Sequence, residues 1–158
     1  MKLYIVTHGD KMSGANPGLA STGTDQIVRI REELLGKIPK PPLVVIGTGR
    51  RFEQTHIMLF MMNHEIPVKR SPFCGSADSL EKDGSIMLAN GEKVAMADYI
   101  GLIGTPGFHA WSWLCNLPEG TLLCAGEELL TSLGLKNLCK KGVLIEVDTE
   151  TQDGRQID

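Results

Sequence analysis

The sequence lacks the features that would place it in a membrane, outside the cell or on nucleic acid. No apolar run approaches the ~20 residues needed to span a bilayer. The segment before Thr7 has one Lys and an apolar run of only four residues, Leu3–Val6, which is not the pattern of a signal peptide. The 158 residues carry a net charge of −3 with a pI near 5.8, and no basic stripe is present. We therefore expect a cytoplasmic protein that binds neither membrane nor nucleic acid.

Patterns typical of metal and nucleotide sites are also missing. The four cysteines form no C-x-x-C pair, and no histidine lies at zinc-finger spacing from them. Neither G-x-x-x-x-G-K-[ST] nor G-x-G-x-x-G occurs. We expect no metal and no cofactor. All four thiols are expected to be reduced, with Cys115 and Cys124 in the core.

What the chain does contain is typical of one globular domain spanning residues 1–158. Hydrophobic residues make up 42% and charged residues 22% of the sequence. Three short apolar runs predict strands buried on both faces, each followed by a turn and a helix: Leu3–Val6, Leu43–Ile46 and Thr121–Ala125. This repeated unit predicts an α/β fold of three α/β/α layers around a mostly parallel sheet.

The remaining elements complete this picture. An amphipathic helix is expected to start at the Thr22–Asp25 capping pattern, to bury Ile27, Ile30, Leu34 and Ile38, and to end before Pro39. Further helices are predicted over residues 50–62, 95–103, 109–117 and 127–135, an edge strand over 66–68, and an antiparallel edge strand over 142–147 with a hairpin towards Asp153-Gly154. Residues 71–108 are the least readable part, and 85–89 fit a short strand or an irregular lobe.

His8 and Arg51 are the main candidate site residues in this arrangement. Both follow buried strands, and parallel strands end at one edge, where α/β proteins bind ligands. A crevice flanked there by helix N-termini suits an anion. Gly9 allows a sharp turn and close approach of a ligand. The alternative is that His8 is simply a polar residue ending a strand.

Several motifs, taken in order, resemble those of the histidine phosphatase (phosphoglycerate-mutase-like) superfamily. Leu3–Asp10 resembles the family's first motif, an apolar strand followed by Arg-His-Gly and an acidic residue, and Asn16 with Leu19–Gly23 resembles the family's asparagine and the start of its first helix. Arg51–Thr55 is similar to the family's Arg-Ala-x-Gln-Thr, and Leu122–Gly126 takes the place of the family's late strand, which ends in His-Gly. The short length, with the late strand Val143–Val147, is most similar to the compact phosphohistidine-phosphatase branch.

The resemblance implies a phosphoryl-transfer site that is only partly retained. His8 occupies the place of the nucleophile and Arg51 that of the second phosphate-binding arginine, and Thr7, Asn16 and Gly126 are expected to belong to the phosphate site with Arg51. Thr7 replaces the first arginine and Ala125 the late histidine. Each lost donor typically costs ~10²–10³ in rate, although such effects are not additive.

Candidates for the missing groups are weaker. Glu81, with Asp78 as second choice, is the candidate acid, and His109 is the candidate substitute for the late histidine. Arg50 adjoins Arg51, but consecutive helical residues face about 100° apart, so Arg50 is expected to point elsewhere. His56 and His64 are expected to be surface or packing residues.

Three functions stay open at this point. The preferred one is a degenerate phosphatase that binds a small anionic or phosphorylated ligand, or a phosphoprotein, with weak or no turnover. The second is an active phosphatase of phosphomonoesters or phosphohistidine that uses His8 in a non-standard pocket. The third is a structural subunit whose crevice does nothing. The sequence does not specify the oligomeric state.

Overall fold

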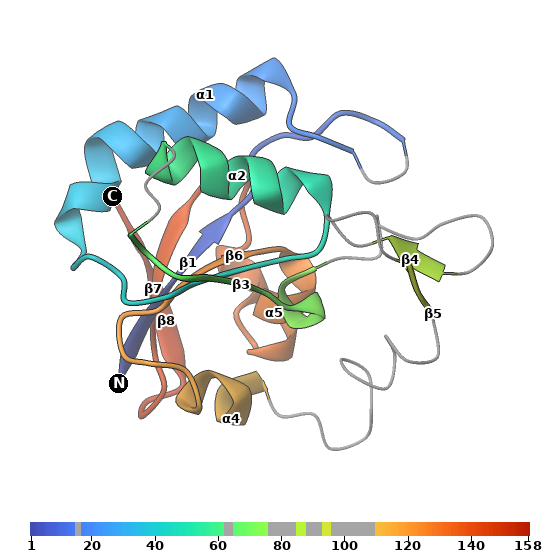
Figure 1. Cartoon of the computed structure of the whole chain (residues 1–158). Helices are drawn as coiled ribbons and strands as arrows, with labels where there is room; N and C mark the ends of the chain where they lie inside the picture. Colours follow the sequence, from blue (N-terminus) through green and yellow to red (C-terminus); the bar gives the residue numbers. More distant parts are fainter. Residues whose placement is uncertain (15–16, 62–64, 76–84, 88–92, 96–109) are drawn as a thin grey trace.

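A six-stranded sheet forms the centre of the molecule in the computed structural model, which describes residues 1–14, 17–61, 65–75, 85–87, 93–95 and 110–158 (Figure 1). The strand order is β3-β2-β6-β1-β7-β8. The strands are β1 (Lys2–Thr7), β2 (Val44–Ile46), β3 (Val68–Arg70), β6 (Leu122–Ala125), β7 (Leu144–Asp148) and β8 (Asp153–Ile157). A separate two-stranded sheet pairs β4 (Ser85–Met87) with β5 (Lys93–Ala95).

The three predicted buried strands are parallel neighbours, as expected. β6 lies between β2 and β1, and the register aligns Thr7 with Ala125 and Ile46 with Cys124. β3 pairs with β2 at the outer edge, where Pro67 precedes it. β7 runs antiparallel to β1, and β8 closes the opposite edge as a hairpin with β7. The carboxyl ends of β1, β2 and β6 therefore meet at one edge of the sheet.

Helices cover both faces of the sheet (Figure 1). On one face lie α1 (Ser21–Arg29), continued by a π-helical turn (Ile30–Leu34) and a 3-10 turn (Leu35–Lys37), and α2 (Arg50–Phe60). On the other lie α4 (Ala110–Cys115) and α5 (Glu127–Ser132), with short 3-10 turns at Pro72–Cys74 and Lys136–Leu138. Because strand side chains alternate, Tyr4 and Val6 pack towards α1 and α2, whereas Leu3 and Ile5 pack towards α4 and α5. The predicted three-layer α/β/α fold is confirmed.

Some local predictions are wrong. The first long helix begins at Ser21 after Ala20, which provides no side-chain cap, so the capping pattern at Thr22 is not used. The start is set by tertiary contacts instead, because the Ala20 N–H donates to the Asp10 carbonyl. Cys124 is buried as expected, but Cys115 is exposed. All four cysteines are free thiols.

Other predictions concern residues 85–89, the hairpin towards Asp153-Gly154 and the helix over 95–103. Residues 85–87 form a strand, and the β7–β8 turn comprises residues 149–152, so that Asp153 and Gly154 already belong to β8. The helix expected over 95–103 falls almost entirely on residues outside those described. In the parts of the chain that are described, no helix has the length and apolar character needed to cross a membrane.

Gly9 and Gly23 bring the start of the first loop against α1. A Cβ at Gly9 would lie 2.4 Å from the Gly23 carbonyl oxygen, and a Cβ at Gly23 would lie 2.0 Å from the Asp10 carbonyl oxygen. The side chain of Gln26 accepts the Asp10 N–H at 2.8 Å. Gly9 thus permits a close approach of backbone to helix, rather than the close approach of a ligand that the sequence suggested.

Candidate functional site

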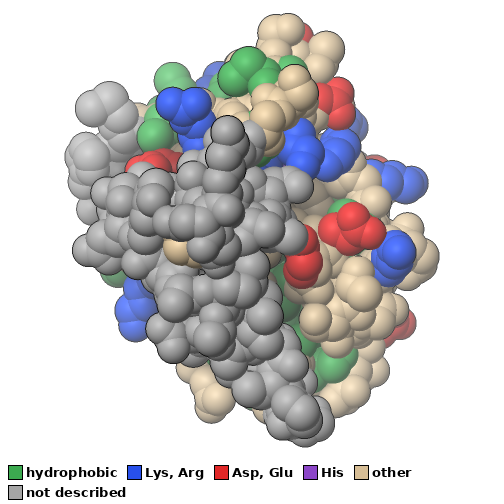
Figure 2. Space-filling view, turned by 90° about the vertical axis from the view of Figure 1, so that its right-hand side faces the viewer, with side chains coloured by type: hydrophobic (Ala, Val, Ile, Leu, Met, Phe, Trp, Pro, Cys, Tyr) green, Lys and Arg blue, Asp and Glu red, His purple; other side chains and the backbone are tan. Residues whose placement is uncertain are grey.

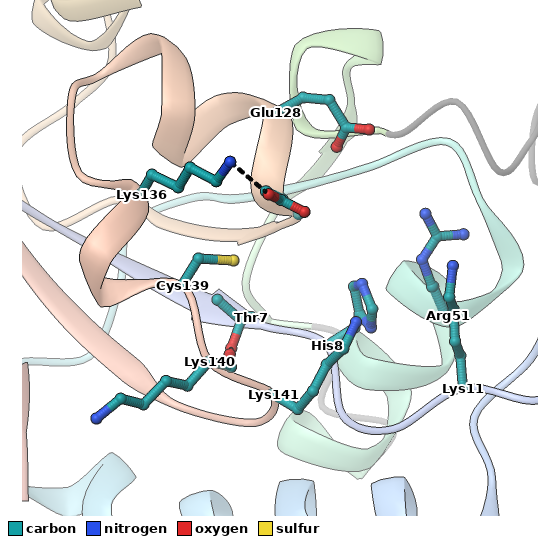
Figure 3. A pocket seen from close by; sticks show the side chains of 11 residues that line it. Thr7, His8, Lys11, Arg51, Glu128, Lys136, Cys139, Lys140 and Lys141 are labelled. Carbon is teal, nitrogen blue, oxygen red and sulfur yellow. Dashed lines mark hydrogen bonds and ion pairs between the residues drawn. The ribbon is translucent and has the colours of Figure 1, made fainter.

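A cavity of about 410 Å³ opens at the carboxyl edge of the parallel strands. The described residues that line it are Thr7, His8, Lys11, Arg51, Gly126, Glu127, Glu128, Lys136, Cys139, Lys140 and Lys141 (Figure 3). They come from the ends of β1 and β6, the starts of α2 and α5, and the loop before β7. The cavity therefore lies where the sequence predicted a crevice.

His8 is held in one orientation with one nitrogen available. Its side chain is only 6% exposed, and its Nδ1–H donates to the Gly9 carbonyl oxygen at 2.8 Å. Since a carbonyl only accepts, Nδ1 carries the proton and Nε2 keeps its lone pair. Burial, together with the smaller effects of the nearby cations Arg51, Lys141 and Lys11, lowers the pKa of His8 to about 4, although the hydrogen bond to the Gly9 carbonyl acts in the opposite direction. The imidazole is therefore neutral at pH 7, as a nucleophile must be.

The lowered pKa of His8 predicts a loss of stability in acid. Between pH 6.5 and about 4, the unfolded chain binds a proton at this imidazole that the folded protein excludes. The free energy of unfolding therefore falls as the pH is lowered through this window, by up to about 3 kcal/mol. We expect urea denaturation of the wild type to show this fall and that of His8→Asn to show a shallower one. Parallel pH profiles of the two proteins would contradict the assignment.

Arg51 reaches the cavity from the first turn of α2. Its side chain is fully buried, and its guanidinium carbon lies 4.5 Å from the ring centroid of Phe52. Phe52 also contacts His8 edge-on, with the ring centroids 5.4 Å apart. A Cβ at Gly126 would lie 3.3 Å from the Phe52 ring. The phenyl ring thus positions both functional side chains, but it offers no hydrogen bond to a ligand on that side.

Thr7 lines the cavity but uses its hydroxyl within the protein. The hydroxyl donates to the Lys140 carbonyl oxygen at 2.6 Å and accepts the Val143 N–H at 2.9 Å. The single hydroxyl proton is therefore directed at the backbone of the loop before β7 and away from a ligand. In this structure Thr7 anchors that loop rather than replacing the arginine expected at this position.

Positive charge dominates the cavity lining. The cationic side chains are Lys11, Arg51, Lys136, Lys140 and Lys141; the acidic ones are Glu127 and Glu128. The chain as a whole carries a net charge of −3, so the basic side chains are concentrated here. Lys136 forms an ion pair with Glu127 at 3.6 Å. On the face of the molecule that Figure 2 shows, Lys and Arg side chains lie beside Asp and Glu side chains. This lining favours an anionic ligand.

Lys11 is positioned by the loop that follows β1. Lys11 pairs with Leu19 in an isolated antiparallel bridge, and the Leu19 N–H donates to the side-chain oxygen of Gln54 on α2 at 2.7 Å. Burial lowers the pKa of Lys11, as do Arg51 and Lys141, while Glu128 raises it. These mutual effects place Lys11 among the charged groups that surround His8.

The structure brings four of the predicted site residues together: His8, Arg51, Thr7 and Gly126 all line the cavity. Arg50 and His56 are not among its lining residues, and the His56 ring packs on Phe60. Asn16, His64, Asp78, Glu81 and His109 lie outside the described residues, so the roles suggested for them remain predictions. No group of three or more His, Cys, Asp or Glu side chains arranged for a metal ion occurs within the described ranges.

The sequence reasoning missed Lys11, Lys141, Glu128 and Phe52. Lys11 lies only three residues after His8, and Glu128 follows the glycine that ends the third strand, so both could have been found from their distance to a strand end. Lys141 belongs to the loop before an antiparallel strand. Its contribution depends on β7 pairing next to β1, which residue spacing alone does not show.

Comparisons with known proteins show the fold. No family model and no curated protein sequence matches this chain. Among solved structures, it is similar to the protein histidine phosphatase SixA complexed with tungstate, with a TM-score of 0.63 and 14% identity over 100% of this chain and 95% of that one.

Two further solved structures agree. A candidate alpha-ribazole-5'-P phosphatase from Escherichia coli K-12 gives a TM-score of 0.66 and 11% identity, covering 99% of this chain and 95% of that one. A mycobacterial glucosyl-3-phosphoglycerate phosphatase gives a TM-score of 0.57 and 15% identity, covering 99% of this chain and 96% of that one. These similarities confirm the fold that the sequence motifs suggested.

Proposed function

We propose that this chain, which has the fold of the histidine phosphatases, binds a phosphate group or another small anion beside His8 and turns it over weakly or not at all. The observation that carries the proposal is that His8 and Arg51 share one mainly basic cavity. A buried guanidinium supplies several N–H donors in a fixed fork, which suits phosphate oxygens. Tungstate, the ion named for the SixA structure, is an oxyanion too.

Weak turnover is expected because, among the described residues, positions 7 and 125 supply no donor to the cavity. Thr7 directs its hydroxyl proton at Lys140, and Ala125 belongs to the apolar core on the α4 and α5 side. Next to His8 stands the phenyl ring of Phe52, which donates no hydrogen bond to a transferring phosphoryl group. Stabilisation of developing charge is usually the largest contribution to such catalysis, so the loss of two donors lowers the rate strongly.

Titration of inorganic phosphate into the wild-type protein at low ionic strength tests this proposal. We expect one phosphate per chain by isothermal titration calorimetry, weakened by added salt because the attraction is electrostatic. Hydrolysis of p-nitrophenyl phosphate, measured on the same sample, is expected to be slow or absent. An absence of phosphate binding at millimolar concentration would refute the proposal.

An active phosphatase is the second candidate, and the state of His8 favours it. Neutral Nε2 is able to attack phosphorus as the bond to the leaving oxygen breaks. The leaving oxygen then takes a proton, and water hydrolyses the phosphohistidine. Glu127 and Glu128 are the described carboxyls that line the cavity, and both are proton donors to test. Rapid hydrolysis that disappears in His8→Ala would favour this candidate over the first.

In a structural subunit without an anion site, we would expect Arg51 to pair with Glu53 or another acid on the surface. Glu53 instead forms an ion pair with Arg70 at 2.9 Å, while Arg51 is fully buried and lines the cavity. This placement supports a binding role for the crevice.

A further inference from the structure

Four hydrogen bonds of 3.0 Å or shorter hold the loop before β7 against the end of β1. Two involve the Thr7 hydroxyl, which donates to the Lys140 carbonyl and accepts the Val143 N–H. Two are between backbones: the Thr7 N–H donates to the Val143 carbonyl, and the Gly142 N–H donates to the His8 carbonyl, each at 3.0 Å. The loop therefore has a fixed position relative to the imidazole.

Gly142 makes the turn of this loop possible. Its φ of +63° is strained for residues with a Cβ, and a Cβ there would lie 2.6 Å from the Cβ of Gln26. The two lysines that precede the turn, Lys140 and Lys141, point in different directions. Figure 3 shows Lys141 rising towards the His8 ring, while Lys140 points away from it. Both residues line the cavity, and the conformation of the loop directs the ammonium group of Lys141 towards His8.

Lys141 is available to a ligand. It lines the cavity, and the structure gives it no ion pair with any carboxylate of the described residues. Its charge, together with those of Arg51 and Lys11, lowers the pKa of His8, so all three cations lie close enough to act on one group. Like charges held together repel one another, and a bound dianion relieves this repulsion.

We infer that Lys141 is a phosphate-binding cation of the cavity and that Thr7 is the positioning residue that holds its loop in place. Thr7 stands where the related motif has an arginine. It contributes no charge itself, but it fixes the loop whose Lys141 supplies a positive charge. This inference rests on the proposed function. It specifies the ligand class further, since clustered lysine and arginine charges favour a doubly charged phosphoryl group over a monoanion.

Calorimetric titration of inorganic phosphate at pH 8, where the dianion prevails, tests the inference. We expect Lys141→Gln to weaken binding about tenfold and Lys141→Arg to restore most of it. Lys69→Gln is the matched control: it removes the same charge from β3, outside the cavity, and is expected to change the affinity less than about twofold.

A double-mutant cycle separates positioning from stability. Thr7→Val is nearly isosteric but removes both hydroxyl hydrogen bonds, and we expect it to weaken phosphate binding several-fold. Once Lys141 is Gln, the same Thr7→Val change is expected to have little further effect on affinity. Full additivity of the two effects would contradict the positioning role. A thermal melt of each variant checks that it is folded.

The other outcomes are also decisive. If the wild type binds phosphate and Lys141→Gln binds it as well as Lys69→Gln does, this inference is wrong and the proposed function stands. If the wild type binds no phosphate, both fail.

Discussion

Arg51→Met is expected to weaken phosphate binding by about 100-fold or more. The guanidinium is fully buried at the start of α2, so the hydrogen bonds that we propose it donates to an anion would form away from water. Removing one partner of such a buried charged pair typically costs 2–5 kcal/mol or more, which corresponds to at least about 30-fold in affinity. Methionine keeps much of the side-chain volume and removes the charge. Calorimetric titration of phosphate measures the loss.

Arg70→Met provides the matched control for this change. Arg70 is a partly exposed arginine of β3 that pairs with Glu53 outside the cavity, so its replacement removes the same group with little expected effect on phosphate affinity. Arg51→Lys keeps a charge but loses the planar fork, and an intermediate affinity is expected. Equal phosphate affinity in Arg51→Met and the wild type would show that the cavity does not bind anions through this residue.

His8→Ala is expected to reduce any hydrolysis of p-nitrophenyl phosphate to the rate without protein. Nε2 is the only unprotonated nitrogen of this imidazole, because Nδ1–H is bound to the Gly9 carbonyl. Removing a nucleophile abolishes covalent catalysis, whatever the contribution of the surrounding cations. Acid-labile ³²P retained after incubation with a small phosphodonor measures the intermediate directly. Any such label found on the wild type is expected to be absent from the variant.

His56→Ala serves as the control for histidine chemistry. His56 lies on α2 but packs against Phe60 and does not line the cavity, so its removal is expected to leave both hydrolysis and labelling unchanged. Phosphate affinity of His8→Ala itself should fall far less than that of Arg51→Met, because a neutral imidazole adds little to anion binding. Hydrolysis that persists in His8→Ala would exclude a role for this histidine.

The sequence predicts the fold well because buried strands and turns leave strong local patterns. The runs at Leu3, Leu43 and Thr121 are short, apolar and followed by glycine, and all three are parallel neighbours in the sheet. Placement of His8 and Arg51 in one cavity followed from this topology, because both residues come just after strand ends.

The rest of the cavity depends on contacts that have no local pattern. Ala20 instead of Thr22 precedes α1 because the Ala20 N–H bonds to the Asp10 carbonyl from a different segment. Lys141 comes near His8 only because β7 pairs with β1 and the intervening loop is bound to Thr7. A threonine at position 7 was interpreted from sequence as the loss of a cation. In the structure, the Thr7 hydroxyl forms hydrogen bonds with the loop that carries a different cation, Lys141.

The central claim is that Arg51 binds one oxyanion in the cavity beside His8, and a crystal structure of the protein soaked in tungstate tests it most directly. The account predicts a tungstate ion in the cavity within hydrogen-bond distance of the Arg51 guanidinium and adjacent to His8 Nε2, with Lys141 as a further contact. A tungstate ion that binds elsewhere on the protein and leaves this cavity empty would contradict it.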